Sequence, residues 1–216
     1  YDAFIQYLSP FESSYQKYLD YRFKGIQEKI IFERGDTRDK NDVRSIILKY
    51  QPEIIVHLAA LPIADLSFTH SEETIGSIIN GTINILDAIS EMDFIQRFVY
   101  ISSSMVYGDF IEVPSTEDHP KTPKDIYGGT KLAGETLTET YGRRYGINYS
   151  IVRPSGVYGP TDVNRRVVQI FLENALENKN LILHGGGDNM IDFTYVNLMI
   201  QSSYCHYLNI QILVYY

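Results

Sequence analysis

The chain has 216 residues, of which 44% are hydrophobic and 13% aromatic, so it can bury a substantial core and is not a disordered protein. Its 19 Lys and Arg residues are outnumbered by 27 Asp and Glu, and the net charge of -8 argues against nucleic acid or an anionic membrane as a partner. The single cysteine excludes a disulfide framework and a thiolate metal cluster, and no apolar run reaches the length of a membrane helix. We therefore expect a soluble, cytoplasmic protein without a bound metal.

Short apolar runs alternate with longer amphipathic stretches along most of the chain, which is typical of βαβ units and a mostly parallel sheet. The runs are almost continuously apolar, as in strands covered on both faces, and predict strands at 29–33, 53–58, 97–102, 147–153 and 181–184. The stretches between them predict helices over about 39–50, 72–92, 125–145 and 163–178. Asp39 or Asn41 can cap the first helix, and Gly146 lies where the third should end.

The sharpest motif is the Tyr127-Gly128-Gly129-Thr130-Lys131 segment of the predicted helix over 125–145. Residues four apart lie on one helix face, so a phenol and an ammonium group would share a site. At roughly 6 Å the ammonium would favour the phenolate by about 3 kcal/mol at an effective dielectric of 20, or roughly two pKa units. One such spacing is also expected by chance in a chain with 18 tyrosines, so a solvent-exposed pair is the alternative.

Three serines, Ser102-Ser103-Ser104, follow the predicted strand at 97–102, at the end where open parallel sheets bind ligands. A serine there can hydrogen-bond a substrate hydroxyl or carbonyl while the tyrosine exchanges its proton. Together these residues would form a Ser/Tyr/Lys set for hydride-transfer chemistry. Serines that only cap a loop are the alternative.

The order and spacing of four segments resemble the extended short-chain dehydrogenase/reductases, the NAD-dependent epimerase/dehydratase group that includes UDP-galactose 4-epimerase. The segments are SSSMVYG, YGGTK, RPSGVYGP and DFTYV. The resemblance covers roughly residues 30–197. It implies Tyr127 as the catalytic acid/base, Lys131 as the modulator of its pKa and a binder of the nicotinamide ribose, and Ser103 as the substrate's hydrogen-bond partner. Ser104 is the alternative for that last role.

The resemblance implies NAD as the cofactor. Its contacts, besides Tyr127 and Lys131, would come from Asp2, Asp36, Thr37, Leu58, Ala59 and Ala60. Asp2 would accept hydrogen bonds from the adenosine ribose, and Asp36 would face the adenine amine, although a plain turn and helix cap explains Asp36 as well. In the HLAA segment small residues would let the backbone approach the dinucleotide, whereas His57 is expected to be structural.

The family's glycine-rich turn, which seats the pyrophosphate on a helix N-terminus, would precede residue 1. We therefore expect an α/β fold with a Rossmann-type, doubly wound parallel sheet that lacks its first βα unit and most of its second strand. The chain would be incomplete at both ends. Residues 1–160 would form a partial NAD-binding domain, and 161–216 a partial substrate-binding region with an atypical C-terminal tail.

Two expected substrate positions depart from the family. Gly156 stands where epimerases commonly have Asn, and Ile191 where an Arg that clamps the diphosphate is usual. Arg165 and Arg166 could supply that charge, because guanidinium groups bind phosphate oxygens well. A solvated helix face is the alternative for both arginines.

The favoured function is that of an NAD-dependent nucleotide-sugar epimerase. Ser104-Met105 offers no acidic pair after Ser103, such as a dehydratase would use to eliminate water. A dehydratase or non-sugar reductase on the same fold, and a non-catalytic remnant that keeps the Ser/Tyr/Lys face, are the alternatives. The family also implies a homodimer through the helices that carry residues 79–89 and 128–142.

Overall fold

The computed structural model describes residues 21–61, 64–162, 166–183, 191–199 and 213–214. The chain divides into two compact units. The first contains Phe32–Pro154 and the strand β6 (Leu213–Val214), and the second contains described residues of 21–31 and 155–199. The assignment of 1–160 to the cofactor and 161–216 to the substrate stays a prediction.

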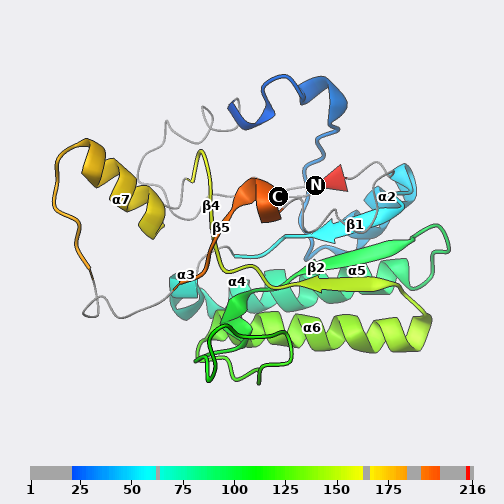
Figure 1. Ribbon diagram of the computed structural model, residues 1–216. Helices are drawn as coiled ribbons and strands as arrows, with labels where there is room; N and C mark the ends of the chain where they lie inside the picture. The colour runs from blue at the N-terminus through cyan, green and yellow to red at the C-terminus, as the bar shows by residue number, and fades with distance from the viewer. Residues whose placement is uncertain (1–20, 62–63, 163–165, 184–190, 200–212, 215–216) are drawn as a thin grey trace. The chain divides into compact units, whose positions relative to one another are not determined.

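A four-stranded parallel sheet in the order β3-β2-β1-β6 organises the first unit (Figure 1). Its longer strands are β1 (Ile54–His57), β2 (Arg97–Ile101) and β3 (Tyr149–Val152). Three predicted strands, at 53–58, 97–102 and 147–153, are therefore confirmed. Because all pairings are parallel, the carboxyl ends of these strands lie at the same edge. The Rossmann-type architecture predicted from the sequence is confirmed.

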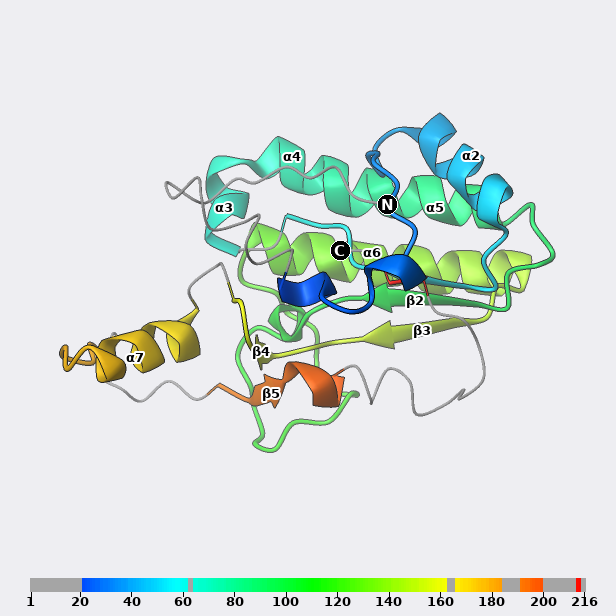
Figure 2. The ribbon, with the colours of Figure 1, turned by 90° about the horizontal axis from the view of Figure 1, so that it is seen from above.

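Helices α5 and α6 lie side by side along the strands (Figure 2). The helices of this unit are α2 (Lys40–Tyr50), α3 (Ala64–Thr69), α4 (Ser71–Ile75), α5 (Gly81–Ile89) and α6 (Ile126–Tyr145). The predicted helix over 72–92 is found as α4 and α5, joined by the π-helical turn η2 (Gly76–Asn80). The predicted helices over 39–50 and 125–145 are confirmed.

Capping residues explain where these helices begin and end. Asp39, rather than Asn41, caps α2, because its carboxylate accepts hydrogen bonds from the backbone N–H groups of Asn41 and Asp42. Asp125 caps α6 through the N–H of Gly128, at 2.6 Å. Gly146 ends α6 with a φ of 72°, the left-handed conformation that glycine adopts without strain.

The core of this unit lies between the sheet and the helices. It is formed by Val43, Ile47, Ile55, Ile85, Leu86, Ala88, Ile89, Phe98 and Tyr100, with further apolar side chains packed against them. Helix α5 contacts both α2 and α6, which explains why its sequence, GTINILDAI, is apolar on most sides. Burial of each large aliphatic side chain contributes about 1.5 to 3 kcal/mol to stability.

Two predicted strands were wrong. Within 29–33, Lys29 closes the 3-10 turn η1 (Gln27–Lys29) and the residues after it form no strand; Ile31 is 57% exposed. Within 181–184, the described residues 181–183 form no strand, and Ile182 is 64% exposed; His184 lies outside the described residues. Both runs have strand-like composition, but composition alone does not make a strand, which also needs paired backbone.

The second unit contains α7 (Val167–Leu176) and a parallel pair of short strands, β4 (Gly156–Tyr158) and β5 (Phe193–Tyr195). Helix α7 confirms the described part of the helix predicted over 163–178. None of this unit's described residues is buried. No helix in the described part of the chain is both long and apolar enough to cross a bilayer.

Candidate functional site

The candidate site begins at the carboxyl end of β2. Ser103 is 8% exposed, and its hydroxyl oxygen accepts a hydrogen bond from the N–H of Met105, which caps the short 3-10 turn η3 (Ser104–Val106). The backbone N–H groups of Ser102 and Ser104 donate to the carbonyls of Val152 and Pro154, at 2.7 and 2.9 Å. The serines therefore lie at the edge of the sheet where the sequence placed them.

Two glycines let α6 lie directly against β2 and η3. A Cβ atom at Gly128 would lie 2.6 Å from the carbonyl oxygen of Met105, and one at Gly134 would overlap the hydroxyl of Tyr100. This close approach brings Tyr127 and Lys131, which lie in the first two turns of α6, to the end of β2. The helix thus delivers the Tyr/Lys pair to the serines.

Lys131 lies in the interior, with 3% of its surface exposed. Its Nζ atom donates a hydrogen bond to the carbonyl oxygen of Ile101, at 2.7 Å, and lies 5.8 Å from the ring centroid of Tyr127 and 5.4 Å from that of Tyr100. Burial lowers the pKa of Lys131 to about 7, because a desolvated ammonium is unfavourable. The amine can therefore gain or lose its proton near neutral pH.

This arrangement can exchange protons with a ligand. The phenol of Tyr127 and the amine of Lys131 lie close enough for the charge of one to affect a proton on the other, with Nζ 5.8 Å from the ring centroid. Lys131 can donate to the carbonyl of Ile101 in both of its protonation states, which holds its Nζ in place. The structure brings Ser103, Tyr127 and Lys131 to one junction of β2, η3 and α6, while their catalytic roles stay predictions.

His57 ends β1 beside the site and is 3% exposed. Its Nε2 lies 3.0 Å from the hydroxyl oxygen of Thr82, which itself donates to the carbonyl of Ile78. The hydroxyl proton is thus already used, so Nε2 carries the ring proton and donates to Thr82. Burial, and then the charge of Lys131, lower the pKa of His57 to about 3, so the ring stays neutral, while its structural role stays a prediction.

The predicted cofactor residues lie in two places. Leu58, Ala59 and Ala60 follow β1 at the same edge of the sheet and are half-buried. Asp36 lies in the turn before α2, where the guanidinium of Arg38 forms an ion pair with it and lowers the pKa of its carboxyl group. Thr37, next to it, packs against Gly81 of α5. Asp2 lies outside the described residues.

The predicted substrate residues divide between the two units. Ser104 begins η3 and is half-buried. In the second unit Arg166 precedes α7 and donates to the carbonyl of Val157, at 3.4 Å, whereas Arg165 lies outside the described residues. The two positions that depart from the family touch each other, since a Cβ atom at Gly156 would lie 2.8 Å from Cγ2 of Ile191. A side chain at 156 would therefore displace Ile191.

A buried carboxylate, which the sequence analysis missed, lies one turn beyond Lys131 on α6. Glu135 is 1% exposed and accepts two hydrogen bonds from Arg153, at 2.8 and 2.9 Å, and one from the hydroxyl of Ser102, at 2.6 Å. Lys121 lies 3.2 Å away. Burial alone would raise the pKa of Glu135, but Arg153, Ser102 and Lys121 together lower it below its ordinary value, so the group is ionised.

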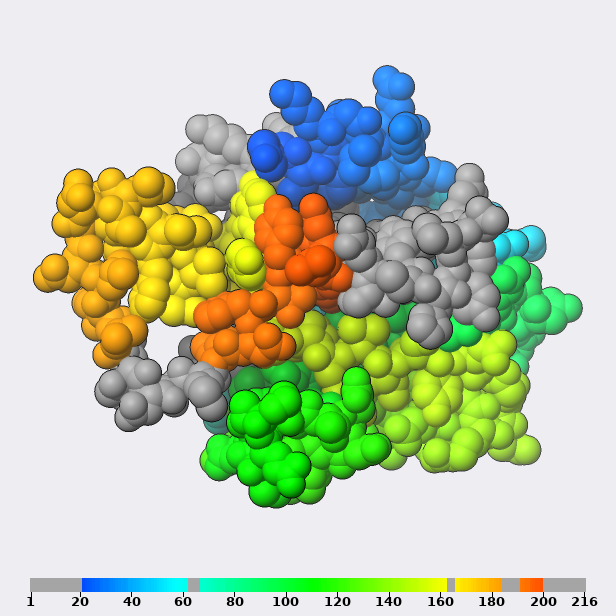
Figure 3. Space-filling view, viewed as in Figure 1, coloured from blue at the N-terminus to red at the C-terminus, as the bar shows by residue number. Residues whose placement is uncertain are grey.

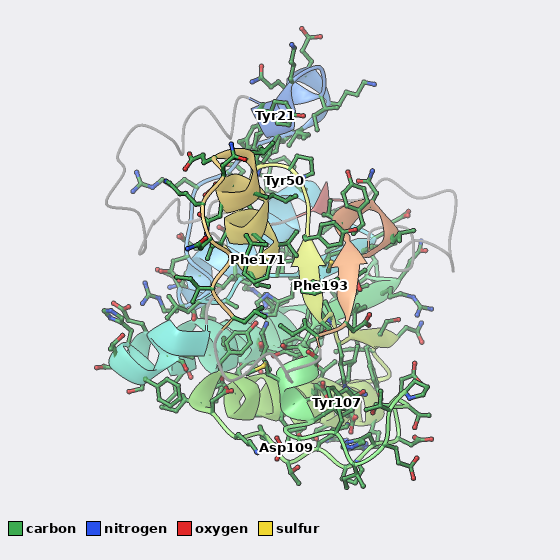
Figure 4. The ribbon with its side chains drawn as sticks, turned by 60° about the vertical axis from the view of Figure 1, so that its left-hand side comes forward. Tyr21, Tyr50, Tyr107, Asp109, Phe171 and Phe193 are labelled. Carbon is green, nitrogen blue, oxygen red and sulfur yellow. The ribbon has the colours of Figure 1, made fainter. Side chains whose placement is uncertain are left out.

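The loop after η3 joins this cluster. Arg153 also donates to the hydroxyl of Tyr107, at 2.9 Å, and to the carbonyl of Glu117. The ring of Tyr107 packs edge-on against His119, with centroids 5.5 Å apart. Figure 4 shows Tyr107 and Asp109 in this loop near α6, and in Figure 3 the green residues of the loop lie beside the yellow-green residues of α6. The loop thus covers the guanidinium of Arg153.

One sequence signal could have identified Glu135. Tyr127, Lys131 and Glu135 are spaced by four, so they form one polar stripe along α6. An acid on a stripe that also carries a buried lysine is itself expected to be buried and paired. No comparable local pattern marks Arg153 as its partner, because the pairing joins α6 to the end of β3.

Comparison with known proteins shows the family to which this chain belongs. Residues 13–205 match the NAD dependent epimerase/dehydratase family. The dTDP-glucose 4,6-dehydratase of Haemophilus influenzae is 30% identical over 188 residues, which cover 82% of this chain and 55% of that protein. The chain spans about half the length of such curated relatives.

The solved structures that are similar to this chain include nucleotide-sugar 4-epimerases. The UDP-glucuronic acid 4-epimerase of Bacillus cereus, in complex with UDP-glucuronic acid and NAD, has a TM-score of 0.80 and 27% identity, covering 94% of this chain and 62% of that one. The UDP-glucose 4-epimerase of Thermotoga maritima, with UDP-glucose, has a TM-score of 0.76 and 25% identity, covering 82% and 59%. Since the family match spans most of the chain, including β2, η3 and α6, this protein belongs to the NAD dependent epimerase/dehydratase family.

Proposed function

We propose that this chain carries the acid–base face of an NAD-dependent nucleotide-sugar epimerase. The observation that carries the proposal is the buried Lys131 amine, bonded to the last residue of β2 and 5.8 Å from the ring of Tyr127, with Ser103 two residues further along the same strand end. Buried amines with a lowered pKa are suited to proton exchange near neutral pH.

The chain's own residues would act on the substrate hydroxyl. Tyr127 would remove the proton of this hydroxyl, and Lys131 would stabilise the phenolate form of Tyr127 that accepts it. Ser103 would donate a hydrogen bond to the substrate oxygen as it becomes a carbonyl. NAD, when bound, would supply the hydride acceptor and, after the keto sugar has rotated in the site, the hydride donor for its other face. Tyr127 would then give back the proton to the oxygen, and the returned hydride and proton together leave no net oxidation.

The described residues fit part of a dinucleotide. Ala59 and Ala60, at the end of β1, are small and half-buried, so the dinucleotide could approach the backbone there. The Asp36 carboxylate, which accepts from Arg38, could also accept a hydrogen bond from the adenine amine. Lys131 is proposed to reach the nicotinamide ribose. Epimerisation is favoured over dehydration because Ser104 and Met105 supply no acid after Ser103.

The substrate class rests on the two similar structures described above, which are complexes with UDP-glucose and UDP-glucuronic acid. A second candidate, reduction of a non-sugar carbonyl, is favoured by the contact between Gly156 and Ile191, which places apolar surface where the family has polar groups. The cytoplasmic location, the homodimer through 79–89 and 128–142, and phosphate contacts from Arg165 and Arg166 belong to the proposal as well.

Titration calorimetry of NAD with the 216-residue chain tests the proposal, together with an epimerisation assay on UDP-glucose. We expect NAD to bind and Lys131→Ala to weaken binding. Tyr127→Phe should keep NAD affinity within about threefold but lower the epimerisation rate by about 100-fold or more, because only the acid/base hydroxyl is removed.

A folded chain that binds no NAD would contradict the proposal and favour a non-catalytic remnant. NAD binding with turnover of a non-sugar carbonyl instead of UDP-glucose would favour the reductase. Circular dichroism of each variant serves as the control for folding.

A further inference from the structure

Helix α6 holds the end of β2 at two adjacent points. The Nζ of Lys131 donates to the carbonyl of Ile101, at 2.7 Å, and the hydroxyl of Ser102 donates to Oε1 of Glu135, at 2.6 Å. Ile101 and Ser102 are consecutive, and Lys131 and Glu135 are one turn apart on the same helix face. A shift of the strand end that breaks one of these hydrogen bonds would therefore strain the other.

Glu135 also ties this strand end to two further segments. Arg153, just after β3, donates to both of its carboxylate oxygens, and Lys121 of the loop before α6 lies 3.2 Å away. Through Arg153 the contacts extend to the hydroxyl of Tyr107. The bidentate geometry fixes the direction of the carboxylate, because two parallel hydrogen bonds leave it little freedom to rotate.

We propose that Glu135 is a positioning residue for the acid–base pair, which holds the Ile101–Ser103 strand end so that Lys131 and Ser103 stay in register with Tyr127. This inference rests on the proposed function. Glu135 acts through Ser102 and the backbone of β2 rather than by touching the substrate. Without it, the strand end would loosen, and water would reach the Nζ of Lys131.

Asp87 of α5 provides a matched control. Its carboxylate also joins separate elements, since it accepts from Lys40, at 2.8 Å, and from the hydroxyl of Tyr141, at 2.6 Å. None of these partners belongs to the strand end at 101–103. A variant at Asp87 therefore removes a comparable interhelical anchor from the same unit without altering the contacts of Lys131.

The test is the titration of Lys131 in the full chain, followed by NMR of lysine labelled at Cε, with the resonance assigned by its loss in Lys131→Arg. In Ser102→Ala, which changes no charge, the pKa of Lys131 should rise from about 7 by about one unit or more, because hydration relieves the penalty of burial. Glu135→Gln also removes a negative charge one turn away, which acts in the opposite direction, so that variant is assessed by turnover. In Asp87→Asn the pKa of Lys131 should stay unchanged.

Turnover provides the second readout. If the chain is active, Ser102→Ala and Glu135→Gln should lower kcat by about tenfold and leave KM within about twofold, because positioning acts on the reacting geometry rather than on binding. If Glu135→Gln does not fold, Ser102→Ala decides the question, since it removes one hydroxyl and leaves the Glu135–Arg153 ion pair intact.

An unchanged Lys131 titration in folded Ser102→Ala would overturn the inference. An equal rise in Asp87→Asn would overturn it too, because the effect would then reflect general loosening. A wild-type chain that neither binds NAD nor turns over UDP-glucose would refute the proposed function, while the titration still decides whether Glu135 positions Lys131.

Discussion

The burial of Lys131 lowers the stability of the folded chain. Burial lowers its pKa from the ordinary 10.5 to about 7, so between these values the unfolded chain binds more protons than the folded one. The free energy of unfolding therefore rises as the pH increases from about 7 to 10.5. Below pH 7 the full cost of burying the lysine charge destabilises the folded chain. At pH 7 the penalty is about 4 kcal/mol, which is a large share of the stability of a typical domain.

We predict that Lys131→Met stabilises the chain at pH 7 by about 2 kcal/mol. The substitution removes the charge penalty but leaves the carbonyl of Ile101 without its donor, which costs about 1 to 3 kcal/mol. It should also reduce the rise in stability between pH 7 and 10. Urea unfolding at pH 7, 8.5 and 10 measures both effects, and a loss of stability at pH 7 would refute the prediction.

The residues of the candidate site were predictable to different degrees. Tyr127 and Lys131 follow from a spacing of four, and Ser103 from the end of an apolar run, which are local patterns. Glu135 went unnoticed because an acid on a helix is ordinarily solvated, and its burial is stabilised by Arg153 and Ser102 from other elements. Its spacing of four from Lys131 is a local signal, but no local pattern in the sequence marks its pairing with Arg153.

At the scale of elements, the contact of α6 with β2 depends on glycine. A Cβ atom at Gly134 would overlap the hydroxyl of Tyr100, whereas one at Gly129 would meet nothing within 4 Å. The two positions thus share a helix and an amino acid but differ in surroundings. Alanine favours the helix by about 1 kcal/mol over glycine, so only steric overlap can reverse the sign.

We predict that Gly134→Ala lowers the free energy of unfolding by about 2 kcal/mol, because α6 or Tyr100 must move to admit the methyl group. Gly129→Ala, the control, should raise it by about 0.5 to 1 kcal/mol. Thermal and urea unfolding of both variants test this. Equal effects of the two substitutions would show that the overlap at Gly134 is relieved without cost.

The elements also show what sequence patterns miss. The strands at 53–58, 97–102 and 147–153 were correctly predicted because each finds a parallel neighbour. The run at 29–33 has similar composition but forms no strand. Composition predicts which segments favour extended backbone, whereas pairing is decided by the rest of the fold.

At the scale of the whole molecule, the two units differ in how well they bury apolar surface. The first has a continuous core, while the second has no buried residue among those described, and Leu172 and Leu176 of α7 are 58% and 85% exposed. Segments with few buried contacts open at low free-energy cost. The second unit should therefore open more readily than the first.

We predict that limited trypsin treatment cleaves after Lys179 before it cleaves after Arg44 or Arg143. All three side chains are exposed, with Lys179 just beyond α7 and the two arginines on helices that pack in the first unit. Mass spectrometry of early fragments distinguishes the sites. Cleavage at Arg44 first would show that the first unit opens more easily than its core implies.

The spacing of Tyr127, Lys131 and Glu135 also limits which insertions α6 can tolerate during evolution. One residue inserted between 127 and 135 would rotate the following part of α6 by about 100°. The carboxylate would then leave Ser102 and Arg153 while the phenol kept its place, so the insertion of a single residue would separate the two ends of the site. Substitutions can be accommodated one at a time, but the length of this segment is fixed.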